Sequence, residues 1–153
     1  MKKTLLVIPL VITLLSSASA ADNSSGFGLG VMAGEPTGIS FKGWVSPGSA
    51  IDGGLAWSFE GDGNIHIHVD YIVHHFTLIK IEKGSLPLYY GIGGRFRFRD
   101  DRDDDIGIRI PVGLDYLFAN SSFDVFFEVV PILDLAPSTE LSFNAAIGGR
   151  FFF

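Results

Sequence analysis

Alternating apolar and polar residues divide most of this chain into eight short segments. In each segment the apolar residues recur at every second position, and glycine, proline, asparagine, aspartate or serine mark the breaks. Side chains alternate between the two faces of a β-strand, so this period predicts strands. The eight predicted strands are residues 27–34, 37–45, 50–60, 65–76, 86–98, 106–118, 123–135 and 141–153.

The length of these segments favours a barrel that crosses a membrane. A transmembrane strand needs roughly 9–11 residues, and the segments are of about that length with short turns between them. No segment shows a convincing helical period, and no linker separates a second domain. The pattern therefore predicts one all-β domain, an eight-stranded antiparallel up-and-down transmembrane β-barrel.

The two faces of the predicted strands differ in kind. In residues 106–118, 123–135 and 141–153 one face carries no charge and is rich in isoleucine, valine, leucine and phenylalanine. The opposite face combines glycine with isolated charges of both signs and a few large apolar groups, which suits the packed lumen of a narrow barrel. We expect the uncharged face to contact lipid. The main alternative is a soluble, secreted, lipocalin-like binder with its apolar face inside.

The first twenty residues have the pattern of a cleavable signal peptide. Lys2 and Lys3 precede the apolar run at residues 5–15, and Ala18 and Ala20 form a small-residue cleavage pattern. The run is shorter than the roughly 20 apolar residues of a transmembrane helix. We therefore expect export of residues 21–153 as an outer-membrane β-barrel domain in a Gram-negative bacterium.

Charge and composition exclude several classes of function. The formal net charge is −6 and becomes more negative once the two N-terminal lysines are removed, so a nucleic-acid partner is not expected. The chain has no cysteine, which excludes disulfides, thiol catalysis and a cysteine lipid anchor. We expect no cofactor.

The C-terminus resembles the strand signal by which bacterial outer-membrane barrels are recognised for insertion. The chain ends at Phe153, with Phe151 and further apolar residues at every second position before it. This pattern predicts recognition by the barrel-assembly machinery. The expected surroundings are outer-membrane lipid and lipopolysaccharide, and we expect a monomer.

Charged residues of both signs fall on the face that should line the lumen. They are Lys42, Asp70, Arg95, Arg97, Arg109, Asp115, Glu128 and Arg150. Unpaired buried charges are very costly, so we expect a paired network that fills the lumen. If the fourth hairpin turns near residues 83–85, Asp70 should lie opposite Arg95 or Arg97. A narrow path for ions or solutes is the alternative interpretation.

Two groups of residues are candidate metal ligands. His66, His68 and Asp70 share one face of a predicted strand, a spacing that can ligate zinc, although nearby arginines would oppose a cation. The acidic run at residues 99–105 supplies Asp100, Asp101 and Asp103, whose carboxylates are typical calcium ligands. Histidines hydrogen-bonded inside the lumen and a solvated acidic loop are the simpler interpretations.

A lipid A-modifying enzyme is a further alternative. Ser58 would lie beside His66 if the third hairpin turned at residues 61–64, with Glu60 or Asp70 to orient the histidine. No nucleophile elbow is present. We therefore expect a protein without catalytic residues.

Four stretches resemble an uncharacterised family of small bacterial outer-membrane proteins. They are GEPTGISFKGW (residues 34–44), PLYYGIGGRFRF (87–98), IRIPVGLDYLF (108–118) and DVFFEVVPILDLAPST (124–139). The resemblance implies a barrel and brings no known activity. In strand number the prediction is also similar to the OmpA/OmpX-type barrels, and a shared fold does not determine function. The expected role is that of a small structural or surface protein of the outer membrane.

Overall fold

The computed structural model describes residues 24–58, 64–100 and 103–153. The predicted signal peptide of residues 1–20 lies outside these ranges, as do Glu60 and Asp101. Across the described residues, no helix has the length and apolar character needed to cross a membrane.

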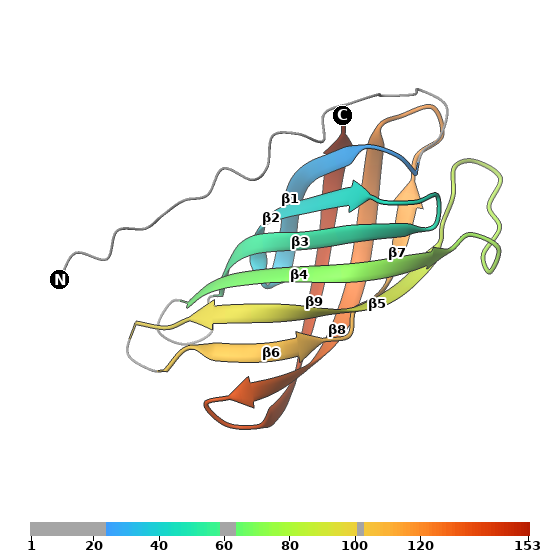
Figure 1. Cartoon of the computed structure of the whole chain (residues 1–153). Coiled ribbons are helices and arrows are strands. Elements are labelled where there is room, and N and C mark those ends of the chain that lie inside the picture. The colour runs from blue at the N-terminus through green and yellow to red at the C-terminus, as the bar shows by residue number, and fades with distance from the viewer. Residues whose placement is uncertain (1–23, 59–63, 101–102) are drawn as a thin grey trace.

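Within these ranges the chain forms nine strands in one antiparallel sheet (Figure 1). They are β1 (Phe27–Glu35), β2 (Thr37–Trp44), β3 (Ser49–Ser58), β4 (Asn64–His75), β5 (Leu88–Phe98), β6 (Asp105–Arg109), β7 (Val112–Leu117), β8 (Phe123–Ala136) and β9 (Glu140–Phe152).

Strands β6 and β7 are two halves of one barrel strand. Both pair with β5 on one side and with β8 on the other. The interruption falls at Ile110 and Pro111, where proline has no N–H to donate to a ladder. The sixth segment, predicted as continuous, is therefore broken locally, while the ring keeps the eight strands that the alternation predicted.

The sheet closes on itself and forms a barrel. With β6 and β7 counted as one barrel strand, each strand pairs with its neighbour along the chain, and β1 pairs with β9 from Gly28↔Phe152 to Glu35↔Ala145. Closure satisfies the backbone groups that an open sheet would leave at its edges. The strands also tilt, as Figure 1 shows.

The two faces of the barrel are divided as the alternation predicted. The outer face exposes a belt of large apolar side chains, with Val31 68% and Phe143 66% exposed. The inner face buries Lys42, Arg95 and Arg109 completely. This distribution is the reverse of that in a barrel with an apolar core and a polar surface.

The connection between β4 and β5 corrects one predicted pairing. It spans residues 76–87 at the barrel end where β1 begins and β9 ends, and it is a long loop rather than a turn centred on residues 83–85 (Figure 1). Because β4 ends at His75 and β5 begins at Leu88, Asp70 lies opposite Gly93. The prediction that Asp70 faces Arg95 or Arg97 is wrong: those two arginines lie opposite His68 and His66.

Candidate functional site

The charged lumen is the candidate functional site. Its side chains come from alternate positions of the barrel strands and form three groups along the barrel. We name them by their position along the barrel. The terminus-side cluster lies toward the end of β9, the loop-side cluster lies toward the connection between β5 and β6, and the central cluster lies between them.

The terminus-side cluster consists of Lys42, His74, Asp115, Asp124 and Arg150. Lys42 donates to Asp115, and its Nζ lies 2.8 Å from His74 Nε2. Arg150 donates two hydrogen bonds to the Asp124 carboxylate, from Nε at 3.1 Å and from Nη2 at 2.9 Å. Its Nη2 also lies 3.8 Å from Asp115. Two-point contacts between arginine and carboxylate are the stronger ion pairs, so this cluster should hold its geometry tightly.

The central cluster consists of Asp70, Tyr89, Arg109 and Glu128. Arg109 Nε donates to both Asp70 oxygens at 3.1 Å, and its Nη2 lies 3.4 Å from Glu128. The Tyr89 hydroxyl donates to Glu128 at 2.9 Å. Every member of this cluster is buried, so each partner compensates the desolvation of another.

A glycine makes the Asp70–Arg109 pair possible. Gly93 on β5 is the cross-strand partner of both residues, so Arg109 must reach over it to meet Asp70. A Cβ atom on Gly93 would collide with Asp70 Oδ1 and with the Val69 carbonyl oxygen. The absent side chain therefore allows an ion pair to span three strands.

Replacing Gly93 by alanine should lower the free energy of unfolding by about 1–3 kcal/mol, because the new methyl group displaces a buried ion pair. Gly94→Ala is the matched control: its Cβ would meet nothing closer than the Gly107 carbonyl oxygen at 3.7 Å. Urea titration of both variants in lipid vesicles measures the difference. Equal stabilities would contradict this role for Gly93.

The loop-side cluster consists of Arg95, Arg97, Arg99, Asp105 and Asp134. Arg95 Nη2 donates to Asp134 at 2.6 and 2.8 Å. Asp105 Oδ2 lies 2.5 Å from Arg99 and 3.6 Å from Arg97. This cluster borders the mouth of the barrel, where the Arg97 side chain is partly exposed.

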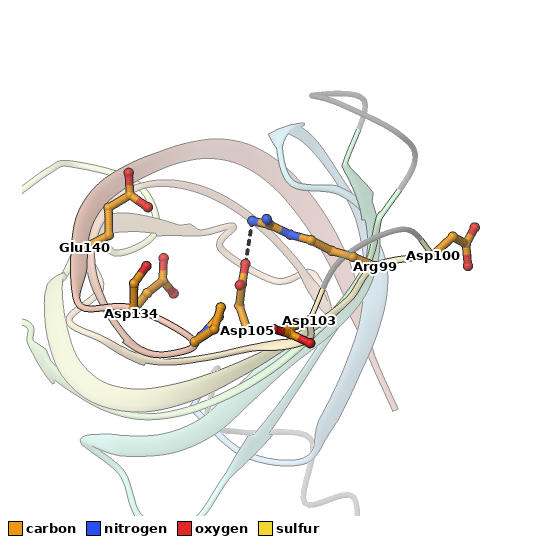
Figure 2. Close-up of a pocket in the computed structure, with 8 residues that line it drawn as sticks. Arg99, Asp100, Asp103, Asp105, Asp134 and Glu140 are labelled. Carbon is orange, nitrogen blue, oxygen red and sulfur yellow. Dashed lines mark ion pairs between the residues drawn. The ribbon is translucent and has the colours of Figure 1, made fainter.

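A hollow of about 700 Å³ opens at this mouth. Figure 2 shows Arg99 reaching across it to Asp105, with Asp134 and Glu140 on the neighbouring wall. Its lining residues are Arg99, Asp100, Asp103, Asp105, Asp134, Pro137, Ser138 and Glu140. The mouth is therefore mainly acidic, although its deepest carboxylates are already paired with arginines.

Comparison with known proteins identifies the fold. No family model matches the chain, and no curated protein matches it. A solved structure does: the N-terminal β-barrel domain of Pseudomonas aeruginosa OprF, with a TM-score of 0.63 and 16% sequence identity over 86% of this chain and 98% of that chain.

The chain is similar in fold to the OprF barrel. At this level of identity the similarity bears on architecture alone, and it supports the expected OmpA-type barrel. Membership of the uncharacterised family stays a prediction.

The candidate metal ligands do not gather into a ligand set. His66 and His68 stack edge-on with ring centroids 5.4 Å apart, and their partners on β5 are arginines. Asp100 and Asp103 line the mouth, where Asp100 points away from Asp105 (Figure 2). In the part of the chain that the structure describes, no group of three or more histidine, aspartate or glutamate side chains is arranged to hold a metal ion.

The register places the serine and histidine of the hydrolase alternative at diagonal rather than directly opposite positions. His66 pairs with Ala56, and Ser58 pairs with Asn64. The third member considered for that site, Glu60, lies outside the described residues.

Several lumen residues were absent from the predicted network. They are Asp52, His74, Tyr89, Asp105, Asp124 and Asp134. Each lies an even number of positions away from the other inward-facing residues of its strand. The alternation of faces along the sequence was therefore sufficient to place these residues in the lumen. Asp52 differs from the others because it lies directly opposite Asp70, and its nearest cationic nitrogen is Arg150 Nη1 at 3.7 Å.

Proposed function

We propose that this chain is a small outer-membrane protein with a structural or surface role, whose barrel is closed to solutes by its own side chains. One observation carries the proposal: large apolar side chains are exposed on the outside of the strands, while arginine and lysine are buried inside. In a bilayer, apolar side chains on the outside contact acyl chains and charged side chains on the inside are kept away from them, so both features are favourable.

The exposed apolar surface argues for lipid rather than water. The belt includes Val31, Ile92, Phe127 and Ile147, which lie on four different barrel strands. Soluble monomers rarely expose contiguous apolar patches beyond a few hundred Å². Acyl chains cover such a belt without a penalty, and this supports the membrane assignment over a soluble secreted binder.

The packed lumen argues against an open pore. Tyr89, Arg95, Arg109 and Arg150 are each at most 1% exposed, and they project into the barrel from β5, β6 and β9. The interiors of eight-stranded barrels are normally filled by side chains. We therefore expect no steady conductance in planar bilayers at a protein concentration that inserts many barrels.

Fractionation tests the membrane assignment. The folded protein should pellet with outer membranes and migrate differently on electrophoresis before and after boiling. Recovery in the soluble periplasmic pool, with identical migration of boiled and unboiled samples, would support the soluble binder instead. A protein-dependent change in lipid A mass would support the enzyme alternative, and discrete single-channel steps would support the channel.

The terminal phenylalanine supplies a test of assembly in cells. Phe153 is 62% exposed, and its backbone N–H donates to the Phe27 carbonyl oxygen at 2.9 Å. Phe153→Ser should lower the amount of folded barrel in outer membranes several-fold, because the predicted insertion signal is lost. Phe143→Ser, on the same face of β9, is the control and should assemble more fully. If both variants refold equally in vesicles and assemble equally in cells, Phe153 is not an assembly signal.

A further inference from the structure

The loop that joins β4 to β5 exposes both apolar side chains and lysines. It spans residues 76–87 and extends beyond the ends of the two strands (Figure 1). Leu78 is 64% exposed and Ile81 is 37% exposed. Lys80 lies between them in the sequence, Lys83 follows, and both lysines are exposed. Covering the aliphatic side chains with another apolar surface would be favourable, and the barrel itself does not cover them.

Both ends of this loop are fixed to the barrel. Phe76, at its start, lies beside the rings of Trp44 and His74, with centroids 6.4 and 6.1 Å away. Near its end, Ser85 pairs with Leu117 through two backbone hydrogen bonds of 3.0 and 2.8 Å. The exposed middle of the loop is therefore held close to the end of the barrel wall.

One contact places the loop beside the lipid-facing side of that wall. The Tyr116 hydroxyl donates to the Lys83 carbonyl oxygen at 3.2 Å. Tyr116 points outward, because its neighbours along β7, Asp115 and Leu117, are both buried in the lumen. Its ring packs edge-on against Phe118, with ring centroids 4.6 Å apart. The loop thus adjoins outward-facing aromatic side chains at the end of the apolar belt, which is where a membrane barrel meets the interface of the bilayer.

The two ends of the barrel differ in charge. At the terminus-side end, the connections at residues 45–48 and 118–122 carry no charged side chain. The connection between β4 and β5 carries two lysines, Lys80 and Lys83, and one acid, Glu82. The opposite mouth is mainly acidic. The terminus-side end is therefore the one at which cationic side chains can attract anionic groups.

We propose that the loop at residues 76–87 binds the headgroups of anionic phospholipids in the leaflet at the terminus-side end. Leu78 and Ile81 enter the edge of the acyl layer, where they continue the apolar belt. Lys80 and Lys83 contact the phosphates, since the aliphatic stem of a lysine can lie along apolar surface while its ammonium reaches the headgroups. The attraction falls off within a Debye length, so it selects lipids directly beside the barrel. This inference rests on the membrane assignment proposed above.

Quenching by brominated lipids tests the position of the loop and the kind of lipid beside it. The chain has no cysteine, so Leu78→Cys supplies one site for a bimane label. The labelled, folded barrel is inserted into equimolar vesicles of phosphatidylcholine and phosphatidylglycerol, with bromine on the acyl chains of one lipid or the other. Brominated phosphatidylglycerol should quench the label roughly two- to fivefold more strongly than brominated phosphatidylcholine, because the lysines concentrate the anionic lipid locally.

Charge variants of the loop separate headgroup recognition from apolar insertion. In the labelled Leu78→Cys protein, the double change of Lys80→Gln and Lys83→Gln should abolish the preference for phosphatidylglycerol. Glu82→Gln is the matched control, because it also removes a loop charge but should keep or increase the preference. Equal quenching by the two lipids with both lysines present, or a preference that survives the loss of both, would overturn the proposal.

Two further label sites distinguish failure of this inference from failure of the membrane assignment. Val31→Cys lies on the apolar belt, and Ser138→Cys lies at the mouth. A label at Val31 should be quenched equally by both lipids, and a label at Ser138 should not be quenched. If the Val31 label is quenched and the Leu78 label is not, the loop lies in water and this inference alone is wrong. If neither label is quenched, the membrane assignment fails and the inference fails with it.

Discussion

Replacing Arg150 by methionine should lower the free energy of unfolding by about 3–5 kcal/mol, the largest loss expected for a single lumen residue. Arg150 compensates three carboxylates: it holds Asp124 directly and lies 3.7 Å from Asp52 and 3.8 Å from Asp115. Its guanidinium also stacks over Phe126 at 4.2 Å. Methionine keeps part of the packing and leaves Asp124 and Asp52 without their main counter-charge.

Two further variants show whether the loss of stability comes from leaving carboxylates without a counter-charge or from removing any buried charge. Asp52→Asn also removes a buried charge, but it relieves the repulsion with Asp70 directly opposite, so its stability should be unchanged or higher. Adding Asp124→Leu to Arg150→Met should recover part of the loss, because a buried ion pair replaced by apolar groups is often neutral. Urea unfolding in lipid vesicles provides the comparison. If Asp52→Asn is as costly as Arg150→Met, the pairing described for this cluster is wrong.

Replacing Val31 by arginine should lower the free energy of unfolding by about 2–4 kcal/mol in lipid vesicles. Val31 lies at the middle of β1 and is 68% exposed on the outer face. At that depth a charged side chain contacts acyl chains, and desolvation of the guanidinium opposes folding. In a water-soluble barrel the same change at an exposed position would be nearly neutral.

Val45 provides the positional control for this second prediction. It is 56% exposed and follows β2 at the end of the barrel, where a charge reaches the interface and costs about 0–1 kcal/mol. A large difference between Val31→Arg and Val45→Arg is therefore expected from the vesicle titrations. Equal and small costs at both positions would favour the soluble alternative.

The sequence by itself determined the strands, their number around the barrel and the face to which each side chain belongs. Alternation places Arg109 and Arg150 inside and Ile147 and Phe151 outside, and the structure agrees at all four positions. This information is local, because a strand presents successive residues to opposite faces whatever strand lies beside it.

Only the tertiary structure decided which charges meet. A period of two is unchanged when one strand slips past its neighbour by two residues, so the faces stay correct while every partner changes. The loop at residues 76–87 fixes the register between β4 and β5. In this register Gly93, rather than an arginine, lies opposite Asp70. Arg109 then pairs with Asp70 across that glycine, and this contact between β4 and β6 depends on the closed, three-dimensional arrangement of the strands.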